Sequence, residues 1–544
     1  MLGQMMAVPL LISDLLGHAA RCYGDTEIVS RTVEGHIHRY TYADAWGRAQ
    51  KLANALARLG LESGDRVGTL AWNGYRHFEI YYAVSGSGLV CHTINPRLFD
   101  DQIVYIINHA DDRHLFVDLS FMPLIERIAD RLPQVRSIVV MTDRAHMPES
   151  ALANLVCYED LIAPEPEAFD WPVFDENTAS GLCYTSGTTG NPKGALYSHR
   201  SIVLHTYAIN MPDVFGLSAL DVCLPVVPMF HVNAWCLPYA AAMVGTKLVL
   251  PGPHLDGASL HALISQEGVT VTAGVPTVWQ GLLGWCDAND AQLAPLARVV
   301  IGGSACPPAM VKAFNRHGTR VIHAWGMTET SPLGATNTLL RKHRDWSADR
   351  LAELEVKQGR PPFGVEMKIV DATGAALAHD GAVHGNLKVR GPWIAAGYFR
   401  QAPDAAHAEA GWFETGDVAT IDPDGFMHIV DRSKDVIKSG GEWISSIALE
   451  NAAVGHPAVR EAAAIARPDP KWGERPRLVV ALKPGMELSA AELRTYFEAH
   501  LAKWSIPDDI VIVDDLPHTA TGKLLKLELR RLYGGETVLG ALKL

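Results

Sequence analysis

Eleven consecutive residues, from Tyr184 to Gly194, read YTSGTTGNPKG and combine hydroxyl side chains, three glycines and one lysine. Glycine lets the backbone approach phosphate oxygens and reach positive φ, so successive N–H groups can converge on an anion. The hydroxyls add donors, and Lys193 adds a mobile positive charge. The pattern predicts a polyphosphate-binding loop, with an ordinary polar surface loop as the alternative. It is not a Walker A loop, which needs Ser or Thr directly after the lysine.

The composition is that of an ordinary globular chain. Of the 544 residues, 48% are hydrophobic and 20% are charged, which is usual for a folded protein with a sizeable core and more than one domain. The formal net charge of −13 argues against a nucleic-acid binder, which usually carries a basic excess. No apolar run of about 18 residues occurs, so no membrane span is expected.

The eight cysteines are scattered, and no Cys-x-x-Cys pair occurs among them. This spacing argues against a zinc site or a disulfide framework and favours a reducing compartment. Cys183 and Cys306 flank the candidate site, and we interpret both as buried apolar side chains rather than nucleophiles. The apolar N-terminus lacks a basic flank and is interrupted by Asp14, so it does not fit a signal peptide. A cytoplasmic location is therefore expected.

Helical and strand patterns alternate along most of the chain. In chain order they predict a helix capped by Thr41 and Asp44 and ended by Gly60, a strand over 67–72, a helix over 76–86, and strands and helices over 89–94, 248–250, 258–267 and 269–273. This alternation predicts an α/β fold in which helices cover parallel sheets.

The pattern changes after about residue 360, where short alternating runs are separated by turn sequences. The runs 418–421 and 426–430 flank the turn at 422–425, so we expect them to pair antiparallel. The pattern over residues 432–544 predicts a small α+β unit. Ser489 and Glu492 form a capping box there for a helix near 490–502.

Four further motifs follow the glycine-rich loop in a fixed order. They are WGMTET at 325–330, WFETGD at 412–417, DRSKD at 431–435 and PHTATGK at 517–523. Together with the loop they resemble the signatures of the adenylate-forming superfamily, which includes acyl-CoA synthetases, luciferases and the adenylation domains of peptide synthetases. The resemblance extends over nearly the whole chain.

The resemblance implies an architecture and a reaction. A large N-terminal domain, 1–431, would combine parallel sheets and helices with a distorted β-barrel, and a small mobile α+β domain, 432–544, would follow. ATP and a carboxylic acid would form an acyl adenylate and pyrophosphate, and CoA would then displace AMP to give acyl-CoA. Mg²⁺ would accompany ATP. The small domain would swing about Lys434 between the two half-reactions.

The resemblance also implies the ATP site. Thr185 and Glu329 match the residues at the metal, and Thr328 matches a donor to the α-phosphate. Asp417 and Arg432 match the contacts to ribose. Trp325 replaces an aromatic residue, often Tyr, that stacks on adenine. The other nucleotide-binding positions are Ser186, Gly187, Thr188, Thr189, Gly190, Lys193, Gly302, Gly303, His323 and Ala324. For the glycine pair the alternative is an ordinary turn.

A second group of residues matches positions for the acid and for CoA. His231 would lie beside the nascent acyl phosphate, and Val232 and Trp235 at the gate between the acyl tunnel and the ATP site. Lys523 would contact the carboxylate and the α-phosphate during adenylation. The residues that would serve thioester formation are Lys438, Gly440, Gly441 and Trp443. A surface or packed histidine and a core tryptophan are the alternatives at 231 and 235.

Three other functions fit the sequence less well than an acyl-CoA ligase. Nothing in the chain calls for the oxygen chemistry of a luciferase. The region 229–240 has no acidic residue to hold a substrate amine, which disfavours amino-acid activation. A non-catalytic nucleotide-binding protein would be expected to lose Lys523 or Glu329 first, and both are present. The runs VNAW and KSGGEWISS most resemble medium- and long-chain fatty acyl-CoA synthetases and bacterial 3-methylmercaptopropionate-CoA ligases, whose fatty acyl members are often homodimers.

Overall fold

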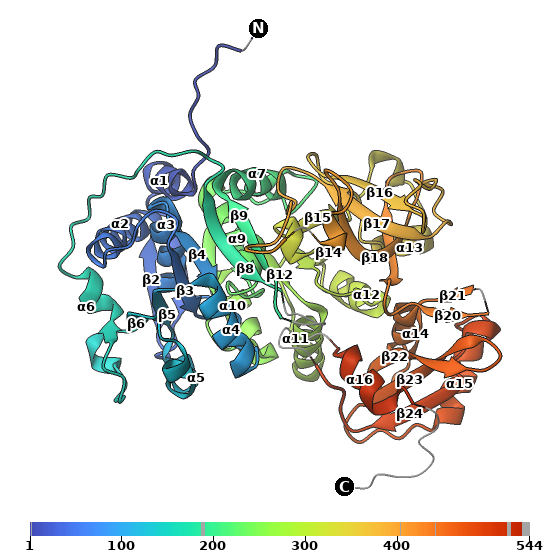
Figure 1. Ribbon diagram of the computed structural model, residues 1–544. Helices are drawn as coiled ribbons and strands as arrows, with labels where there is room; N and C mark the ends of the chain where they lie inside the picture. The colour runs from blue at the N-terminus through green and yellow to red at the C-terminus, as the bar shows by residue number, and fades with distance from the viewer. Residues whose placement is uncertain (2, 186–190, 403, 441, 519–523, 536–544) are drawn as a thin grey trace.

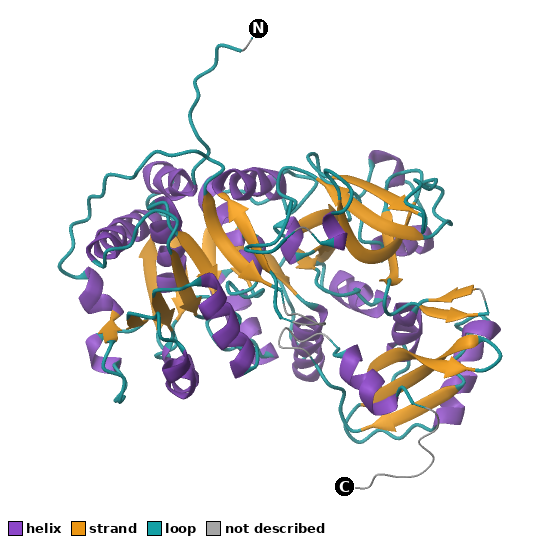
Figure 2. Cartoon of the chain, viewed as in Figure 1, coloured by secondary structure: helices purple, strands orange, loops and turns teal. Residues whose placement is uncertain are grey.

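The computed structural model describes residues 1, 3–185, 191–402, 404–440, 442–518 and 524–535. Two large sheets and a smaller antiparallel sheet, each with its helices, make up what we call the N-terminal part. A fourth sheet with its own helices follows as the C-terminal part (Figures 1 and 2).

The first large sheet has seven strands in the order β7-β6-β5-β3-β4-β8-β9. Its neighbours are parallel except for the antiparallel hairpin of β8 and β9. The strands are β3 (Arg66–Leu70), β4 (Val90–Thr93), β5 (His114–Val117), β6 (Ser137–Val140), β7 (Leu155–Cys157), β8 (Ala179–Tyr184) and β9 (Gly194–Ser198).

The second large sheet has eight strands in the order β15-β14-β13-β12-β10-β11-β1-β2. It is parallel in its centre and antiparallel at each edge. The strands are β1 (Glu27–Arg31), β2 (Ile37–Thr41), β10 (Val222–Pro225), β11 (Lys247–Leu250), β12 (Val271–Gly274), β13 (Arg298–Ile301), β14 (Arg320–Gly326) and β15 (Leu333–Thr336).

Helices fill the space between the two large sheets and cover their outer faces. One buried cluster joins side chains of both sheets to α1–α3 and α9, and α3 is buried along its whole length. The outer clusters involve α4 and α5 on the first sheet and α10–α12 on the second. The helices are α1 (Ile12–Cys22), α2 (Tyr42–Arg58), α3 (Tyr75–Gly86), α4 (Asp100–Ala110), α5 (Met122–Ile128), α6 (Tyr158–Ile162), α7 (His199–Asn210), α8 (Val232–Trp235), α9 (Leu237–Val244), α10 (Gly257–Glu267), α11 (Pro276–Asn289), α12 (Pro308–Arg316) and α13 (Ala348–Glu355). The expected α/β fold of helix-covered parallel sheets is confirmed.

Local sequence signals account for the boundaries of α2. Thr41 and Asp44 form the predicted capping box, and the helix ends just before Gly60, whose φ is +74°. Its positions Ala45, Ala49 and Leu52 are fully buried. The pattern of apolar residues therefore places one face of α2 in the core, as the sequence predicts.

The third sheet is antiparallel, in the order β16-β17-β18-β19. Its strands are β16 (Glu366–Val370), β17 (Gly385–Arg390), β18 (Phe413–Ile421) and β19 (Met427–Arg432). The predicted hairpin is confirmed, because Thr420 lies opposite His428. The described strands form an open sheet rather than a closed barrel. Two single bridges, Gly359–Met427 and Thr336–Arg360, link β19 to β15 in place of a complete strand.

The C-terminal part has a five-stranded sheet in which β23 pairs with β20, β22 and β24. The predicted capping box of Ser489 and Glu492 begins α15, which ends at Glu498 and is shorter than expected. The predicted boundary after Asp431 falls within β19 and stays a prediction. The elements are β20 (Ile437–Ser439), β21 (Glu442–Ile444), α14 (Ser446–Val454), β22 (Val459–Asp469), β23 (Gly473–Leu482), α15 (Ala490–Glu498), β24 (Asp509–Val513) and α16 (Lys526–Tyr533).

Among the described residues, no helix combines the length and the hydrophobicity that crossing a bilayer requires.

A pair of glycines with the same backbone geometry separates the cost of positive φ from the cost of overpacking. Gly60 has φ +74° and open space around it, whereas a Cβ at Gly245, φ +73°, would lie 2.2 Å from Cγ of Tyr23. We expect Gly60→Ala to lower the free energy of unfolding by about 1 kcal/mol. Gly245→Ala should lower it by about 1–3 kcal/mol more than Gly60→Ala does. Urea unfolding of both variants measures the difference. Equal losses would show that the Tyr23 ring moves aside without cost.

Candidate active site

The predicted phosphate-binding loop is the connection between the two strands of the β8–β9 hairpin. Its described ends are held together, because the N–H of Thr185 donates to the carbonyl of Lys193 at 2.9 Å and the N–H of Lys193 donates to Oγ1 of Thr185 at 3.3 Å. Ser186, Gly187, Thr188, Thr189 and Gly190 lie outside the described residues. The hairpin thus fixes where the loop leaves and re-enters the sheet.

The side chain of Lys193 lies over a tyrosine that the sequence motifs did not single out. Its Nζ is 4.7 Å from the ring centroid of Tyr398 and donates to Oδ2 of Asp404 at 2.6 Å. The hydroxyl of Tyr398 in turn donates to Oε1 of Glu329 at 2.7 Å. A lysine of the loop and the predicted metal-binding carboxylate therefore share one aromatic neighbour.

Glu329 lies in a 3-10 turn, Thr328–Thr330, that directly follows β14. The side chain is buried, and the backbone on both sides is held in place. The N–H of Ala395 donates to the carbonyl of Glu329 at 2.7 Å, and the hydroxyl of Tyr197 donates to the carbonyl of Thr328 at 2.7 Å. Burial and the Glu329 carboxylate raise the pKa of Tyr398 above its usual value, so its phenol keeps the proton that it donates.

A buried carboxylate joins the residues predicted to bind the nucleoside. Asp417 is 1% exposed, and it accepts Nε1–H of Trp325 at 2.9 Å on Oδ2 and pairs with Nε of Arg432 at 2.8 Å on Oδ1. Asp417 and Arg432 also lie opposite each other in the β18–β19 ladder. Carboxylate oxygens accept hydroxyl protons, so Asp417 is a candidate acceptor for the hydroxyls of a sugar.

The Gly302-Gly303 pair lies against two of the other predicted residues. A Cβ on Gly302 would be 3.0 Å from the carbonyl oxygen of Ala324 and 3.1 Å from the ring of Trp235. Gly303 has φ +82°, a conformation that favours glycine.

His323 is buried and its Nδ1 lies 3.1 Å from the carbonyl oxygen of Val356. Burial lowers its pKa to about 4, so it is neutral near pH 7.

His231 precedes a turn of unusual backbone conformation. The next five residues, 232–236, all have φ between +46° and +61°, and none of them is glycine. Such left-handed geometry costs about 1–2 kcal/mol per residue. Buried contacts hold the turn, because Sγ of Cys183 lies 3.7 Å from Oδ1 of Asn233 and Sγ of Cys236 donates to the carbonyl of Ser331 at 3.4 Å. Val232 and Trp235 are both buried, so the turn places the predicted gate within the core.

The residues predicted for thioester formation lie apart from the β8–β9 loop. The β20–β21 hairpin, which bears Lys438, Gly440 and Trp443, is at the end of the C-terminal part remote from β8 and β9 (Figure 1). Trp443 is 38% exposed there, and the N–H of Gly440 donates to the carbonyl of Trp472 at 2.8 Å. Gly441 lies outside the described residues. The structure therefore does not bring Lys438, Gly440 and Trp443 to the β8–β9 loop.

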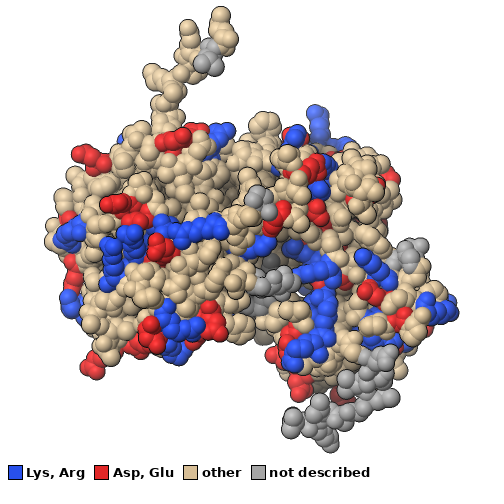
Figure 3. All heavy atoms as spheres, in the orientation of Figure 1, with Lys and Arg blue, Asp and Glu red and all other residues tan. Residues whose placement is uncertain are grey.

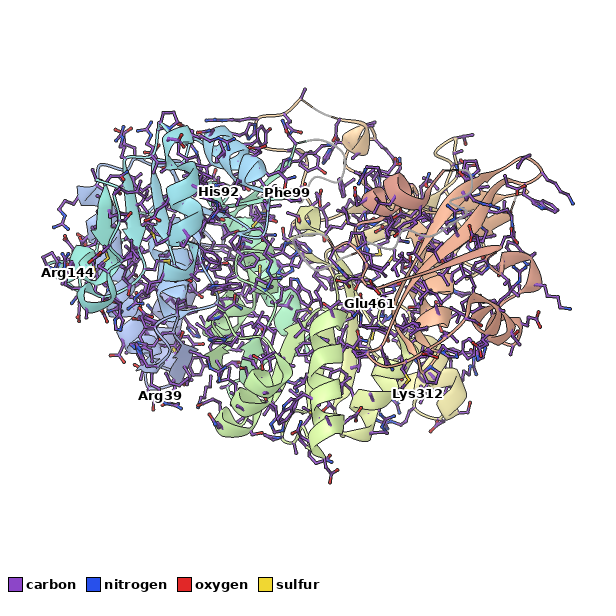
Figure 4. All side chains as sticks on the ribbon, turned by 90° about the horizontal axis from the view of Figure 1, so that it is seen from below. Arg39, His92, Phe99, Arg144, Lys312 and Glu461 are labelled. Atoms are coloured by element: carbon purple, nitrogen blue, oxygen red, sulfur yellow. The ribbon has the colours of Figure 1, made fainter. Side chains whose placement is uncertain are left out.

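A different face of the C-terminal part is turned toward the N-terminal part. Glu461 lies on that side in Figure 4, and its Oε1 is 3.2 Å from Nε2 of His518. Nε2 of Gln280, in α11, donates to the carbonyl of Arg460 at 3.4 Å. Lys523 lies outside the described residues. Figure 3 shows the surface hollowed between the two parts, with Lys and Arg side chains along the C-terminal side of the hollow.

The predicted hinge residue lies between charged neighbours. Lys434 follows β19, and its carbonyl accepts from Nη2 of Arg530 at 3.3 Å. Burial lowers the pKa of the Lys434 ammonium, and the adjacent Asp435 opposes that effect. Nη2 of Arg530 also pairs with Asp435, so α16 is tied directly to the segment that follows β19.

The donor set fits magnesium. Among the described residues, no group of three or more His, Cys, Asp or Glu side chains is placed to hold a metal ion. Glu329 offers carboxylate oxygen and Thr185 a hydroxyl, which are the hard oxygen donors that Mg²⁺ takes. Mg²⁺ draws its remaining ligands from phosphate and water, so a sparse protein set is sufficient.

Sequence and structure comparisons agree on one group of proteins. Residues 16–399 match the family model described as AMP-binding enzyme, and residues 448–523 match the AMP-binding enzyme C-terminal domain. A 3-methylmercaptopropionyl-CoA ligase from Ruegeria lacuscaerulensis is 56% identical over 97% of this chain and 98% of its own length. A medium-chain-fatty-acid–CoA ligase from Ectopseudomonas oleovorans is 54% identical over 98% of both chains. The crystal structure of the anthranilate CoA ligase AuaEII with anthranoyl-AMP has a TM-score of 0.86 at 27% identity, covering 97% of this chain and 99% of that one.

Gly334 provides a test of whether the Trp325 indole must keep its position. A Cβ at residue 334 would lie 2.2 Å from that ring, so Gly334→Ala must displace it. If the ring stacks on adenine, AMP should bind about fivefold more weakly, since aromatic contacts of this kind are worth about 1 kcal/mol. Calorimetric titration with AMP measures the change. Gly281→Ala, which meets nothing within 4 Å, is the control, and unchanged AMP affinity in Gly334→Ala would separate Trp325 from adenine binding.

Proposed function

The chain belongs to the AMP-binding enzyme family and is an ATP-dependent acyl-CoA ligase, and from that premise we propose that its acid is a fatty acid or a short- or medium-chain acid such as 3-methylmercaptopropionate. ATP and the acid give acyl-AMP and pyrophosphate, and CoA then displaces AMP. The observation that carries the assignment of the site is the Asp417 carboxylate, which joins Trp325 and Arg432 beside the turn that bears Glu329.

The nucleoside is assigned to the cluster around Asp417. The oxygens of Asp417 can accept from the ribose hydroxyls, Arg432 can donate to the same sugar, and the Trp325 ring offers a flat surface to adenine. The backbone of Gly302 and Ala324 is assigned to the opposite wall, where Gly302 lies against the Ala324 carbonyl oxygen and the Trp235 ring and a side chain would not fit. His323 and Gly303 support that wall.

The triphosphate is assigned to the β8–β9 loop and to Thr328. Mg²⁺, when it accompanies ATP, would be held by Glu329 and Thr185 and would offset phosphate charge. Tyr398 fixes one carboxylate oxygen of Glu329 through its 2.7 Å hydrogen bond. The Lys193 ammonium, held by Asp404 at the base of the loop, adds positive charge on the same side.

Adenylation requires attack of a carboxylate oxygen on the α-phosphorus, with pyrophosphate as the leaving group. His231 is assigned to the acyl phosphate, where its imidazole can donate to developing charge. Lys523 is assigned to the same centre, because a cation there reduces the repulsion between the carboxylate and the phosphate. In the second step the CoA sulfur attacks the acyl carbonyl and AMP leaves with the bonding electrons.

The side chains near His231 support an apolar acid. Met229, Phe230, Val232 and Trp235 are all buried and uncharged. No carboxylate occurs over 229–240 to pair with a substrate amine. Burial of an alkyl or thioether chain is favourable, whereas burial of an unpaired ammonium group is costly. Such a lining therefore favours an apolar acid over an amino acid.

Thioester formation is assigned to a second arrangement of the C-terminal part. In it, rotation about Lys434 would bring Lys438, Gly440, Gly441 and Trp443 to the acyl adenylate. The separation between β20–β21 and the β8–β9 hairpin is what such a rotation has to close. A homodimer and a cytoplasmic location are also proposed. All eight cysteines are free thiols and seven of them are buried, which supports a reducing compartment.

Lys523→Ala is expected to separate the two half-reactions. Removing one charge-stabilising contact costs roughly 10²–10³ in rate, so acid-dependent ATP–pyrophosphate exchange should fall by that factor. Supplied acyl-AMP should still react with CoA at close to the wild-type rate, because the proposed rotation would take the lysine out of the site. Lys483→Ala, at an exposed position of the C-terminal part, is the control. Equal losses in both half-reactions would contradict the rotation.

Trp235→Ala is expected to change selectivity among acids more than affinity for ATP. The ring lies against Gly302, so its removal leaves space on the acid side of the nucleotide wall. We expect kcat/KM to rise for longer chains relative to 3-methylmercaptopropionate, in a saturated series at fixed ATP and CoA. Unchanged KM for every acid with a raised KM for ATP would place Trp235 in the ATP site instead.

A further inference from the structure

A cavity lies at the amino-terminal edge of the second large sheet, at the opposite end of its strands from the candidate active site. Its volume is about 350 Å³, within the range of about 300–1,000 Å³ that is usual for ligand pockets. It is bounded by the end of α7 at Asn210, by the segment that leads from α7 to β10, and by the first residues of β13 and β14. None of the described residues that line it is assigned above to ATP, the acid or CoA.

Two arginines of the lining occupy adjacent positions on this edge. Arg298 begins β13 and Arg320 begins β14, and the two residues are partners in the parallel ladder. Registered residues of neighbouring strands lie about 4.7–4.9 Å apart and project from the same face of the sheet. The two guanidinium groups therefore start side by side, where like charges repel each other. An anion between them would reverse that repulsion.

Among the described residues, a carboxylate pairs with Arg298 but not with Arg320. Nη2 of Arg298 is 2.7 Å from Oδ1 of Asp221, and the other carboxylate oxygen accepts from Ser218. Arg320 is exposed. It opposes the rise in pKa that burial gives the Glu355 carboxyl, but within the described chain the two side chains form no ion pair. The lining thus includes two guanidinium groups, of which one has an acidic partner.

Two polar atoms of the lining residues have no hydrogen-bond partner within the described part of the chain. They are Nε of Arg298 and Oδ1 of Asn210. The amide of Asn210 is held in orientation, because its Nδ2 donates to the carbonyl of Ala240 at 3.2 Å. Buried polar groups are nearly always paired, and an exception calls for a water, an ion or a ligand.

The lining also includes apolar side chains. Phe215, Leu217 and Ile322 line the cavity and are buried. Apolar side chains next to a group of hydrogen-bonding and charged residues are typical of sites for small organic ligands, in which the polar groups fix the orientation. The combination with two arginines matches a small molecule that has an apolar body and an anionic end.

A buried side chain separates this cavity from the site proposed for the acid. Arg298, Val300 and Gly302 follow one another on one face of β13 and its extension, and Trp235 lies against Gly302. The span from residue 298 to residue 302 is about 13 Å at about 3.3 Å per residue. Val300 lies between them and is fully buried. The cavity is therefore distinct from the place where Trp235 contacts the nucleotide wall.

We propose that this cavity is a second binding site for an apolar carboxylate, separate from the site of adenylation. The carboxylate would lie between Arg298 and Arg320, with its chain on Phe215, Leu217 and Ile322. Oδ1 of Asn210 can accept from a water that accompanies the carboxylate. The choice of ligand rests on the proposed function, because an apolar carboxylate is the amphipathic anion that the enzyme encounters as its substrate.

The test measures octanoate binding by calorimetric titration while the active site is filled with a non-hydrolysable octanoyl-AMP analogue. We expect the wild-type protein to bind octanoate under these conditions. Arg320→Glu should weaken that binding about 10- to 100-fold, the range for loss of a charged hydrogen bond. Octanamide, which has the chain without the charge, should bind to the wild-type protein about tenfold more weakly than octanoate. Acetate, which has the charge without the chain, should bind at least about tenfold more weakly as well.

Arg316→Glu is the matched control, because Arg316 is also exposed, lies four positions before Arg320 and is not part of the lining. It should bind octanoate within about twofold of wild type. Acid-dependent ATP–pyrophosphate exchange should be unchanged in both variants, which also shows that they are folded.

A wild-type protein that binds no octanoate beside the analogue would overturn the proposal, as would wild-type affinity in Arg320→Glu. A raised KM for long acids in the exchange reaction of Arg320→Glu would assign the cavity to the path of the adenylated acid and would exclude a second site. Exchange by the wild-type protein tests the ligase reaction independently of octanoate binding.

Discussion

Parallel pairing of the central strands is the constraint on which the site depends. Because β3, β4, β5 and β8 run in the same direction, their carboxyl ends lie along one edge of the first sheet. The loop between β8 and β9, the segment that follows β4, and Trp72 after β3 all begin at that edge. Asn73 connects the edge to Val227 and Met229 of the second sheet, so residues far apart in sequence are held in a fixed relation without sharing an element.

Charge is distributed through shared partners rather than isolated pairs. Asp417 holds both Trp325 and Arg432, and Tyr398 lies between Glu329 and Lys193. Burying a carboxylate that has no hydrogen-bond or ionic partner would cost on the order of several kcal/mol. These contacts hold two buried carboxylates in fixed positions, which is the kind of preorganisation that a charged ligand requires.

The left-handed turn after His231 is a locally strained part of the fold. Five consecutive non-glycine residues at positive φ are unfavourable, and the surrounding core, with Cys183 and Ser331 in contact, holds them in that conformation. The result is that Trp235 lies on Gly302 while His231 stays next to Phe230. The strained turn therefore sets how Trp235 lies against the Gly302 backbone.

Local signals in the sequence determined much of this protein. The capping boxes of α2 and α15, the hairpin of β18 and β19, and the α/β alternation follow from residue spacing, because caps, turns and amphipathic faces depend on neighbours a few positions apart. The ordered motifs indicated the reaction. Tertiary structure alone decided that Tyr398 bonds Glu329, that β19 joins β15 through single bridges, and that Arg97 lies on Trp72 and Phe230. Each of these contacts joins segments whose pairing depends on sheet order and layer packing, and no short-range pattern records that order.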